Sequence, residues 1–247
     1  MKTSIRIAAW SVLAICACSG DKVHKTSLER NNMHGRVCMV TETSYMPGDS
    51  LVRTGKTVYR YNEQGRQTEG AWYDATDSLV NAARYTGDGN ENIVRGEIAG
   101  ADGTLLQIYD YAYDRHGNME RMLVSQADGR AESRTELRYD RQGRVREIEI
   151  FDGQGGFAAR YKCLYDDRDR VTCRKSYDVD GALMLEYRYE YDDRGNPVSI
   201  RLFNPEGKSL STMSSEYQYD PSGNWTRKTD YASGRPVGQI FREIEYF

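Results

Sequence analysis

A short turn motif, Tyr-Asp-x-x-Gly followed by Asn or Arg, recurs along most of this 247-residue chain and limits the folds that it can adopt. Clear copies are YRYNEQGR (59–66), YAYDRHGN (111–118), LRYDRQGR (137–144), YEYDDRGN (189–196) and YQYDPSGN (217–224), with degenerate copies at 83–90 and 163–170. The second tyrosine of the motif falls at 61, 85, 113, 139, 165, 191 and 219, in steps of 24 to 28 residues. Such regular self-similarity indicates an array of one repeated supersecondary unit.

A second aromatic-Asp-x-x-Gly turn lies between successive copies, so that a turn recurs about every 12–14 residues. Phe151-Asp152 with Gly155, and Tyr177-Asp178 with Gly181, are examples. The Asp side chain hydrogen-bonds forward to the backbone, and the fourth residue takes a left-handed conformation that suits Gly. This is the three-residue hairpin loop with a bulge. The turn-forming residues that we single out are Asp114, Gly117, Asp140, Gly143, Asp192, Gly195, Asp220 and Gly223.

The segments between turns are about eight residues long and rich in Tyr, Arg, Val, Ile and Thr. They predict an all-β fold of tandem β-hairpins with about sixteen antiparallel strands. Because open sheets rarely exceed about ten strands without curling, we expect an extended, twisted or curled antiparallel sheet. The apolar positions do not keep one parity along each segment, so either bulges shift the exposed face or both faces are partly covered. The pattern does not choose between these two, nor does it say whether the sheet closes.

The first residues indicate export. Lys2 and Arg6 precede a short apolar stretch, which is too short to span a bilayer and is typical of a secretory signal. Ile15-Cys16-Ala17-Cys18 resembles a bacterial lipobox, which implies that Cys18 carries a diacylglycerol. We therefore expect a lipoprotein signal peptide at 1–17 and a polar, lipidated tether at 18–33. The alternative is an ordinary signal peptide with incidental cysteines.

The tandem motifs resemble the YD/RHS repeats of bacterial toxin shells and teneurin-type cell-surface proteins, and similar repeats of small bacterial lipoproteins. The resemblance covers 59–247 and implies a YD-repeat β-sheet domain, which we place at 34–247. The chain is much shorter than a shell that encloses a toxin. Asp220-Pro221-Ser222-Gly223 is faintly similar to the acidic self-cleavage motif of those shells, but it is also an ordinary repeat copy.

Three cysteines remain after Cys18: Cys38, Cys163 and Cys173. In a bulged hairpin centred on Arg168, Cys163 and Cys173 would face each other as a closely spaced cross-strand pair. They are therefore a disulfide candidate in an oxidising compartment. The alternative is that both are reduced and pack as small hydrophobic residues.

Composition and motif content exclude several classes of function. With 34 Lys+Arg and 37 Asp+Glu the formal net charge is −3, which does not suit a general nucleic-acid binder. The three histidines share no metal-ligand spacing, and no nucleophile or phosphate-loop motif is present. We therefore expect no catalytic residue, metal or cofactor. Trp72 and Trp225 are possible glycan-stacking residues, or else pack across strands.

Together these features predict a lipid-anchored repeat protein of the bacterial outer membrane, facing the periplasm or the cell surface. We expect it to be non-enzymatic and to bind or scaffold partners through its β-sheet surface, its partners being the membrane and a glycan or an envelope protein. The first alternative is a glycan-binding module of the cell surface. The second is a glycoside-active or self-cleaving enzyme.

Overall fold

The computed structural model describes residues 25–48 and 50–247, so the predicted signal peptide and Cys18 lie outside the described residues. Its strands are β1 (Val37–Met46), β2 (Val52–Tyr61), β3 (Gln67–Tyr73), β4 (Leu79–Gly87), β5 (Ile93–Gly100), β6 (Leu105–Tyr113), β7 (Met119–Gln126), β8 (Ala131–Tyr139), β9 (Val145–Asp152), β10 (Phe157–Tyr165), β11 (Val171–Tyr177), β12 (Leu183–Tyr191), β13 (Pro197–Phe203), β14 (Ser209–Tyr219), β15 (Trp225–Ala232) and β16 (Arg235–Tyr246). The one described helix, α2 (Ser27–Arg30), has four residues, and no helix in the described ranges could span a membrane.

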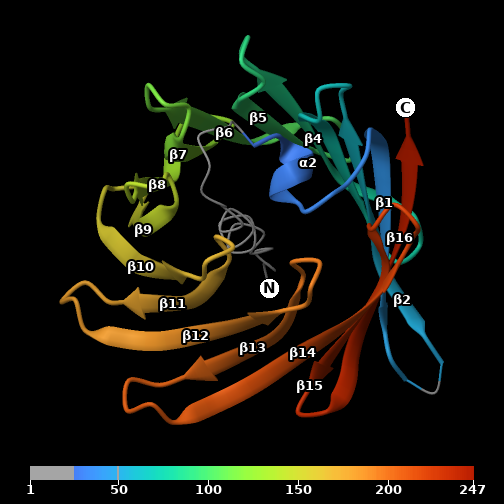
Figure 1. Cartoon of the computed structure of the whole chain (residues 1–247). Coiled ribbons are helices and arrows are strands. Elements are labelled where there is room, and N and C mark those ends of the chain that lie inside the picture. The colour runs from blue at the N-terminus through green and yellow to red at the C-terminus, as the bar shows by residue number, and fades with distance from the viewer. Residues whose placement is uncertain (1–24, 49) are drawn as a thin grey trace, which may run out of the picture.

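The sixteen antiparallel strands are confirmed, and the sheet is not extended: it curls until it closes into a barrel, the point that the sequence pattern left open (Figure 1). The seam pairs β1 with β16, placing Val40 opposite Ile244 and Glu42 opposite Arg242. At this seam Arg242 Nη2 lies 2.6 Å from Glu42 Oε1. Closure removes both exposed strand edges, which is the physical advantage over an open sheet of this width.

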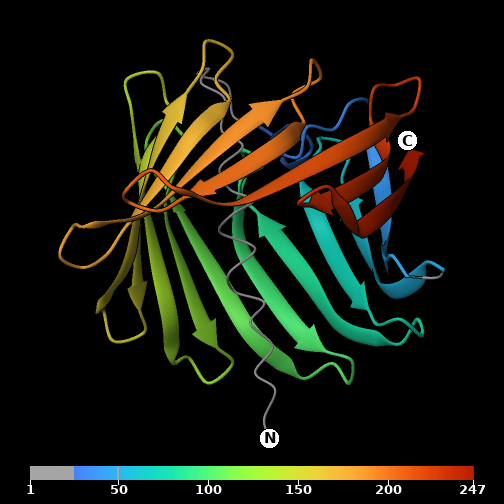
Figure 2. The ribbon, with the colours of Figure 1, turned by 90° about the horizontal axis from the view of Figure 1, so that it is seen from below.

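The turns have the geometry that the motif requires. Within one copy, Gly143 N donates to Asp140 O at 3.1 Å, and the Asp140 carboxylate accepts from Arg144 N at 3.0 Å. Gly143 has a φ of 82°, and Asp169, which replaces glycine in another copy, has a φ of 58°. The glycines of the other singled-out turns, Gly117, Gly195 and Gly223, also have positive φ. Figure 2 shows the turns gathered at opposite ends of the strands.

Each of the fifteen hairpins contains a second irregularity close to its turn, where the register shifts by one residue. In the β8–β9 hairpin, Tyr139 pairs with Val145 but Arg138 pairs with Glu147, so Arg146 is bulged out. Val145 and Ile148 therefore share a face although they are three residues apart. Of the two explanations for the broken parity, these bulges are the one that the structure shows.

The same bulge corrects the predicted facing of the two cysteines. In the β10–β11 hairpin Cys163 pairs with Arg174, and Leu164 pairs with Cys173. Thr172 is the bulged residue, and it moves Cys173 one position out of register with Cys163. The two cysteines consequently lie on opposite faces of the sheet, and no disulfide joins them in the described part of the chain.

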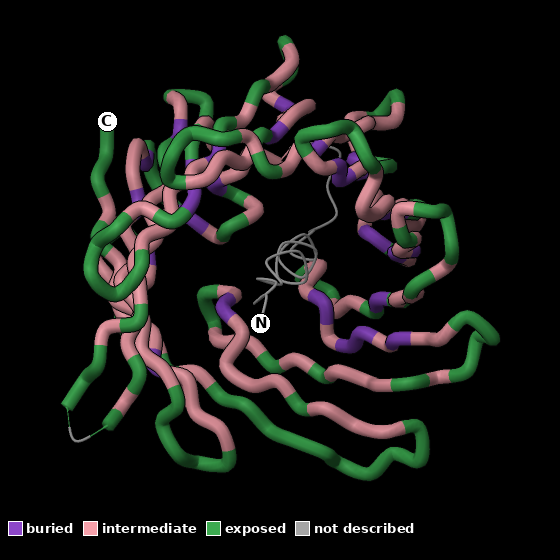
Figure 3. The backbone as a smooth tube through the Cα atoms, turned by 180° about the vertical axis from the view of Figure 1, so that it is seen from behind, coloured by how far each residue is buried: buried purple, intermediate pink, exposed green. Residues whose placement is uncertain are grey.

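The barrel has two chemically different walls. Cross-strand partners share a face, so the registers trace one wall around the sheet from Val40, which packs with Leu28 of the enclosed helix α2. This inner wall carries the main hydrophobic cluster of Tyr109, Met119, Met122, Val124, Leu137, Val145 and Ile148. The outer wall carries most of the charged residues, whereas Glu42, Arg242 and Arg174 lie on the inner wall. Figure 3 shows buried segments along the strands and exposed turns at their ends.

Residues 26–34, which we call the plug, cross one mouth of the barrel. Thr26 and Glu29 form a capping box at α2, and Leu28 N donates to Gly65 O of the β2–β3 turn at 3.1 Å. Leu28 and Met33 are buried. The polar segment 18–33 was expected to be a tether, but its described part thus folds against the barrel, because two apolar side chains are enough to seat it on the inner wall.

Candidate functional site

A ladder of tyrosine hydroxyls closes the barrel wall at the mouth that holds the plug. Neighbouring hairpins separate there, because backbone pairing stops before the strand ends. The tyrosine that ends one strand bridges each gap by donating to the first carbonyl of the preceding strand. The bonds are Tyr113 to Ile93 O at 2.8 Å, Tyr139 to Met119 O at 2.7 Å, Tyr165 to Val145 O at 2.7 Å and Tyr191 to Val171 O at 2.8 Å.

The ladder changes between β13 and β14. Tyr191 and Tyr219 are 28 positions apart, whereas Tyr139, Tyr165 and Tyr191 follow one another at 26. β14 is therefore two residues longer, and it is Tyr217 that keeps the 26-residue phase and donates to Pro197 O at 2.9 Å. Tyr219 does not donate to a backbone carbonyl of the preceding strand, as the ladder tyrosines do. It donates instead to Asp192 Oδ2.

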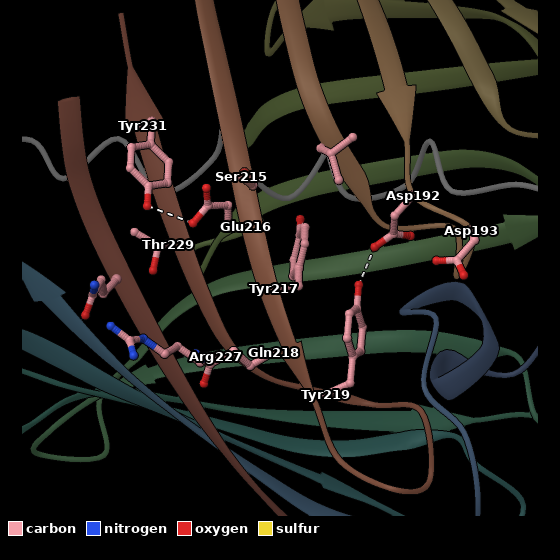
Figure 4. A pocket seen from close by; sticks show the side chains of 12 residues that line it. Asp192, Asp193, Ser215, Glu216, Tyr217, Gln218, Tyr219, Arg227, Thr229 and Tyr231 are labelled. Carbon is pink, nitrogen blue, oxygen red and sulfur yellow. Dashed lines mark hydrogen bonds between the residues drawn. The ribbon is translucent and has the colours of Figure 1, made fainter. Parts of the chain in front are cut away.

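This end of β14 borders a cavity of about 590 Å³, which we call the β13–β14 opening (Figure 4). Backbone pairing between the two strands ends at Ser199 and Ser214. All five residues from Ser215 to Tyr219 line the cavity. Successive residues of a strand point to opposite faces, so a cavity that touches all five meets the edge of β14 and not one of its faces.

The opening is polar and rich in hydroxyl and carboxyl groups. Its lining consists of Asp192, Asp193, Val198, Ser215, Glu216, Tyr217, Gln218, Tyr219, Arg227, Thr229, Tyr231 and Gln239. Three carboxylates and one guanidinium make it acidic. Figure 4 shows Tyr219 pointing to Asp192, and Tyr231 pointing to Glu216, to which it donates at 2.8 Å.

The acidic surroundings keep the tyrosine hydroxyls protonated. Burial, followed by the hydrogen bond to the Asp192 carboxylate, raises the pKa of Tyr219 to about 12. The hydrogen bond to Glu216 raises the pKa of Tyr231, with desolvation as the second cause. Burial likewise raises the pKa of Tyr217. All three hydroxyls therefore act as neutral hydrogen-bonding groups at physiological pH.

Two buried polar atoms at the opening have no hydrogen-bond partner among the described residues: Arg227 Nε and Gln239 Oε1. Arg227 pairs across the strands with Phe241, and Gln239 pairs with Thr229, so Arg227 and Gln239 are diagonal neighbours on one face. One atom is a donor and the other an acceptor. Buried polar atoms are usually satisfied, so this pair marks a place where a ligand could complete the hydrogen bonding.

The residues predicted from the sequence lie in different places. Asp192 lines the opening, whereas Asp220 accepts a hydrogen bond from Tyr246 at 2.9 Å. Trp225 packs edge-on against Tyr217 and beneath the Arg242 guanidinium, 3.3 Å from the ring centroid. Asp114, Gly117, Asp140, Gly143, Gly195 and Gly223 form turns, and Trp72 lies on the inner wall opposite Asn81.

Most of the opening was not predicted from the sequence, including Ser215, Glu216, Arg227, Tyr231 and Gln239. A signal was available in the 28-residue step before Tyr219, which marks the two added residues of β14. Within residues 25–48 and 50–247, no group of three His, Cys, Asp or Glu side chains could hold a metal ion.

Comparison with known proteins supports the fold. No protein-family model and no curated protein sequence matches the chain, so the YD/RHS relationship stays a prediction. A porin-like protein from Bacteroides uniformis ATCC 8492 is similar in structure, with 13% identity, a TM-score of 0.59, and coverage of 85% of this chain and 96% of that one. At this identity the likeness shows a shared β-barrel fold alone.

Two weaker likenesses establish no common fold, because their TM-scores are below 0.5. A porin-like protein from Bacteroides vulgatus ATCC 8482 has 13% identity, a TM-score of 0.38, and coverage of 85% of this chain and 98% of that one. The Photorhabdus luminescens Tc holotoxin pore has 14% identity, a TM-score of 0.19, and coverage of 76% of this chain and 15% of that one.

Proposed function

We propose that this chain is a lipid-anchored, non-enzymatic protein of the bacterial cell envelope, whose barrel stands in water beside the outer membrane and binds partners through its wall. The observation that carries this proposal is the distribution of charge between the two walls. Arg, Lys, Glu and Asp recur across neighbouring strands on the outer wall. The inner wall carries mainly tyrosine and aliphatic residues, with a few charged side chains such as Glu42, Arg242 and Arg174 among them.

Glu149 on β9 illustrates how the outer wall is built. Its carboxylate lies 2.9 Å from Arg138 Nη2 on β8 and 2.7 Å from Arg160 Nη2 on β10, so three successive strands are joined by charge. Lys175 and Glu186 continue this pattern on β11 and β12, at 3.2 Å. Such networks add lateral stability to the sheet and suit a surface in contact with water.

A barrel that crosses the outer membrane has the opposite polarity. Its outward side chains form an apolar band about 25 Å tall, and each Arg or Lys on the lipid face near the midplane costs about 2–4 kcal/mol. Here the outer wall holds charged residues on strand after strand. The porin-like neighbour from Bacteroides supports an envelope setting, and the charge on the wall favours a barrel beside the membrane over a pore through it.

The attachment to the membrane rests on the sequence of the first eighteen residues. A lipidated Cys18 would hold the barrel at the surface by several acyl chains, which anchor stably where one chain binds only marginally. The lipobox-like Ile15-Cys16-Ala17-Cys18 and the preceding charged and apolar stretch support this assignment.

The hydrogen bonding of the carboxylates favours binding over catalysis. Asp192 Oδ1 accepts from Arg194 N at 3.0 Å and from Asn196 N at 2.8 Å, and its Oδ2 accepts from Tyr219. A carboxylate whose two oxygens accept these hydrogen bonds stabilises its turn. Asp220 is held similarly by Asn224 N and Tyr246, which argues against the glycoside-active and self-cleaving alternatives.

A glycan-binding role is the other candidate, and the polar opening is the observation that favours it. The two tryptophans do not support it, because Arg242 covers a face of Trp225 and Trp72 lies on the inner wall. The opening, by contrast, presents hydroxyl, amide and carboxylate groups at the barrel wall.

The test of the envelope proposal compares the natural chain with two variants in a bacterial host. The natural chain should incorporate an alkyne-tagged fatty acid and fractionate with membranes, and Cys18→Ser should lose the label. In the second variant, residues 1–18 are exchanged for a cleavable secretory signal. The exported barrel should then remain in the aqueous phase without detergent. Partition of this unlipidated barrel into detergent or membranes would contradict a water-facing wall.

A further inference from the structure

We propose that the β13–β14 opening is a binding site for an uncharged oligosaccharide. This inference rests on the proposed function as a binding protein, and it names the class of ligand. It is carried by the unpartnered donor and acceptor at the opening, by the charge of the lining, and by the exposed strand edge that the two added residues of β14 create.

The unpartnered atoms specify the hydrogen bonding that the ligand must supply. Arg227 Nε–H needs an acceptor and Gln239 Oε1 needs a donor. As diagonal neighbours across β15 and β16 their Cα atoms lie about 7–8 Å apart, and their side chains can reach toward one ligand. A hydroxyl group both donates and accepts, so two hydroxyls of one sugar satisfy both atoms. An unsatisfied buried polar atom destabilises the empty site, and a ligand that supplies the missing hydrogen bonds removes that cost.

The charge of the opening selects against anions. Asp192, Asp193 and Glu216 line the opening together with the guanidinium of Arg227. Arg194 lies beside the opening, over the Tyr219 ring, so carboxylates still outnumber guanidinium groups. A uronic acid, a phosphate or a sulfated sugar would bring another negative charge close to three carboxylates. Like charges in a partly desolvated site repel, whereas a neutral hydroxyl donates to a carboxylate without that cost.

The tyrosines provide the surfaces on which sugar rings can rest. Tyr217 and Tyr231 line the cavity, and each combines an apolar ring with a hydrogen-bonding tip. Tyr219 contributes its hydroxyl, because the Arg194 guanidinium lies over its ring, 4.3 Å from the centroid. The volume of about 590 Å³ falls within the range of about 300–1,000 Å³ that is common for ligand sites.

An extended peptide that adds a strand to the edge of β14 is the competing occupant. Such peptides are recognised by backbone hydrogen bonds together with apolar pockets for alternate side chains. Val198 is the one aliphatic residue in the lining, so the opening lacks the row of apolar pockets that a peptide would need. This observation favours the sugar.

The experiment measures binding by calorimetry with the unlipidated chain from Ser19 onward, which includes every described residue. The probes are cellohexaose, maltohexaose, mannohexaose and xylohexaose as neutral oligosaccharides, and hexagalacturonate as the acidic one. At least one neutral probe should bind, and Arg227→Met and Gln239→Leu should each weaken that binding about tenfold or more. Arg201→Met, on the outer wall of β13 and paired with Glu190, is the matched control and should leave the affinity unchanged.

Three results would overturn the proposal: no heat with any neutral probe at millimolar concentration, binding that both variants leave intact, or preferential binding of hexagalacturonate. Selection of extended peptides whose binding depends on Arg227 and Gln239 would also overturn it, in favour of strand addition. Circular dichroism of each variant establishes that the barrel is folded. The membrane fractionation described above is unaffected by these outcomes, so failure of the ligand assignment and failure of the envelope proposal can be told apart.

Discussion

Asn32 of the plug donates a hydrogen bond from Nδ2 to Asn196 Oδ1 at 3.1 Å, across 164 positions of the chain. Asn196 Nδ2 in turn donates to Tyr219 Oη at 3.0 Å, and Tyr219 donates to Asp192. The plug is therefore joined to the lining of the β13–β14 opening by a continuous series of side-chain hydrogen bonds. A second contact of the plug lies at the β14–β15 turn, where the Asn224 side chain accepts from His34 N at 2.7 Å and donates from Nδ2 to His34 O and to Tyr246 Oη, each at 2.9 Å.

Asn196→Ala should lower the free energy of unfolding by about 1–3 kcal/mol, because Asn196 is buried and its loss leaves the part-buried Asn32 amide and Tyr219 hydroxyl without this partner. Urea unfolding followed by circular dichroism measures the loss. Asn118→Ala is the matched control, since Asn118 also follows a turn glycine but donates to Asp114 of its own turn. We expect a smaller loss there, and equal losses would argue against a special role for the contact between the plug and Asn196.

The tyrosine ladder should contribute through its hydroxyl groups. Tyr139→Phe removes the donor to Met119 O while keeping the ring, so we expect a loss of about 1–3 kcal/mol in the free energy of unfolding. Tyr73→Phe should change little, because the contact of Tyr73 is made by its ring, 4.3 Å from Lys56 Nζ. If Tyr139→Phe left the free energy of unfolding unchanged, the strands would hold together at this mouth without the hydroxyl.

The bulged register can be tested with a designed disulfide. Leu164 lies directly opposite Cys173, so Leu164→Cys should form a disulfide with Cys173 under mild oxidation. Mass mapping of non-reduced peptides would detect the link between positions 164 and 173. A native link between Cys163 and Cys173 would instead show that the Thr172 bulge is absent.

The left-handed turn positions predict which substitutions lower the free energy of unfolding more. Gly143 has a φ of 82° and open space where a Cβ would lie, so strain and not crowding determines the effect. Gly143→Ala should lower the free energy of unfolding by about 1–2 kcal/mol. Gly143→Asn should cost less, because Asn tolerates this conformation better. Thermal or urea unfolding of the two variants provides the ranking, and a reversed order would be inconsistent with the turn geometry.

The buried tyrosines predict sensitivity to alkali. Burial raises the pKa values of Tyr61 and Tyr85 to about 12, above the unfolded value of about 10. The folded barrel thus holds these protons more tightly than the unfolded chain does. This stability is fully present below pH 10 and is lost as the pH rises from about 10 to about 12. Tyrosinate absorbance and circular dichroism should change together, whereas ionisation of these tyrosines near pH 10 in a folded barrel would refute the prediction.

The repeats made the hairpins predictable because each turn is encoded locally: Asp140, for example, bonds within four residues of itself. Closure was not predictable in this way, since it depends on Val40 meeting Ile244 after fifteen accumulated twists and shifts. The bulge that separates Cys163 from Cys173 leaves no residue-type signature, because Thr172, Arg146 and Met184 all occupy that position. The opening depends on the two extra residues of β14. These are visible in the 28-residue step before Tyr219, but the step can be interpreted only once the tyrosine ladder is known.

The two residues added to β14 also suggest how an array of uniform hairpins acquires a specialised place. Adding one residue would turn every later side chain of the strand inside out, whereas adding two preserves which side chains face the lumen and merely moves the terminal tyrosine out of phase. A dipeptide insertion is thus the smallest change that creates a recess and leaves the rest of the wall intact. Every other tyrosine-bridged gap around the rim could diversify by the same route.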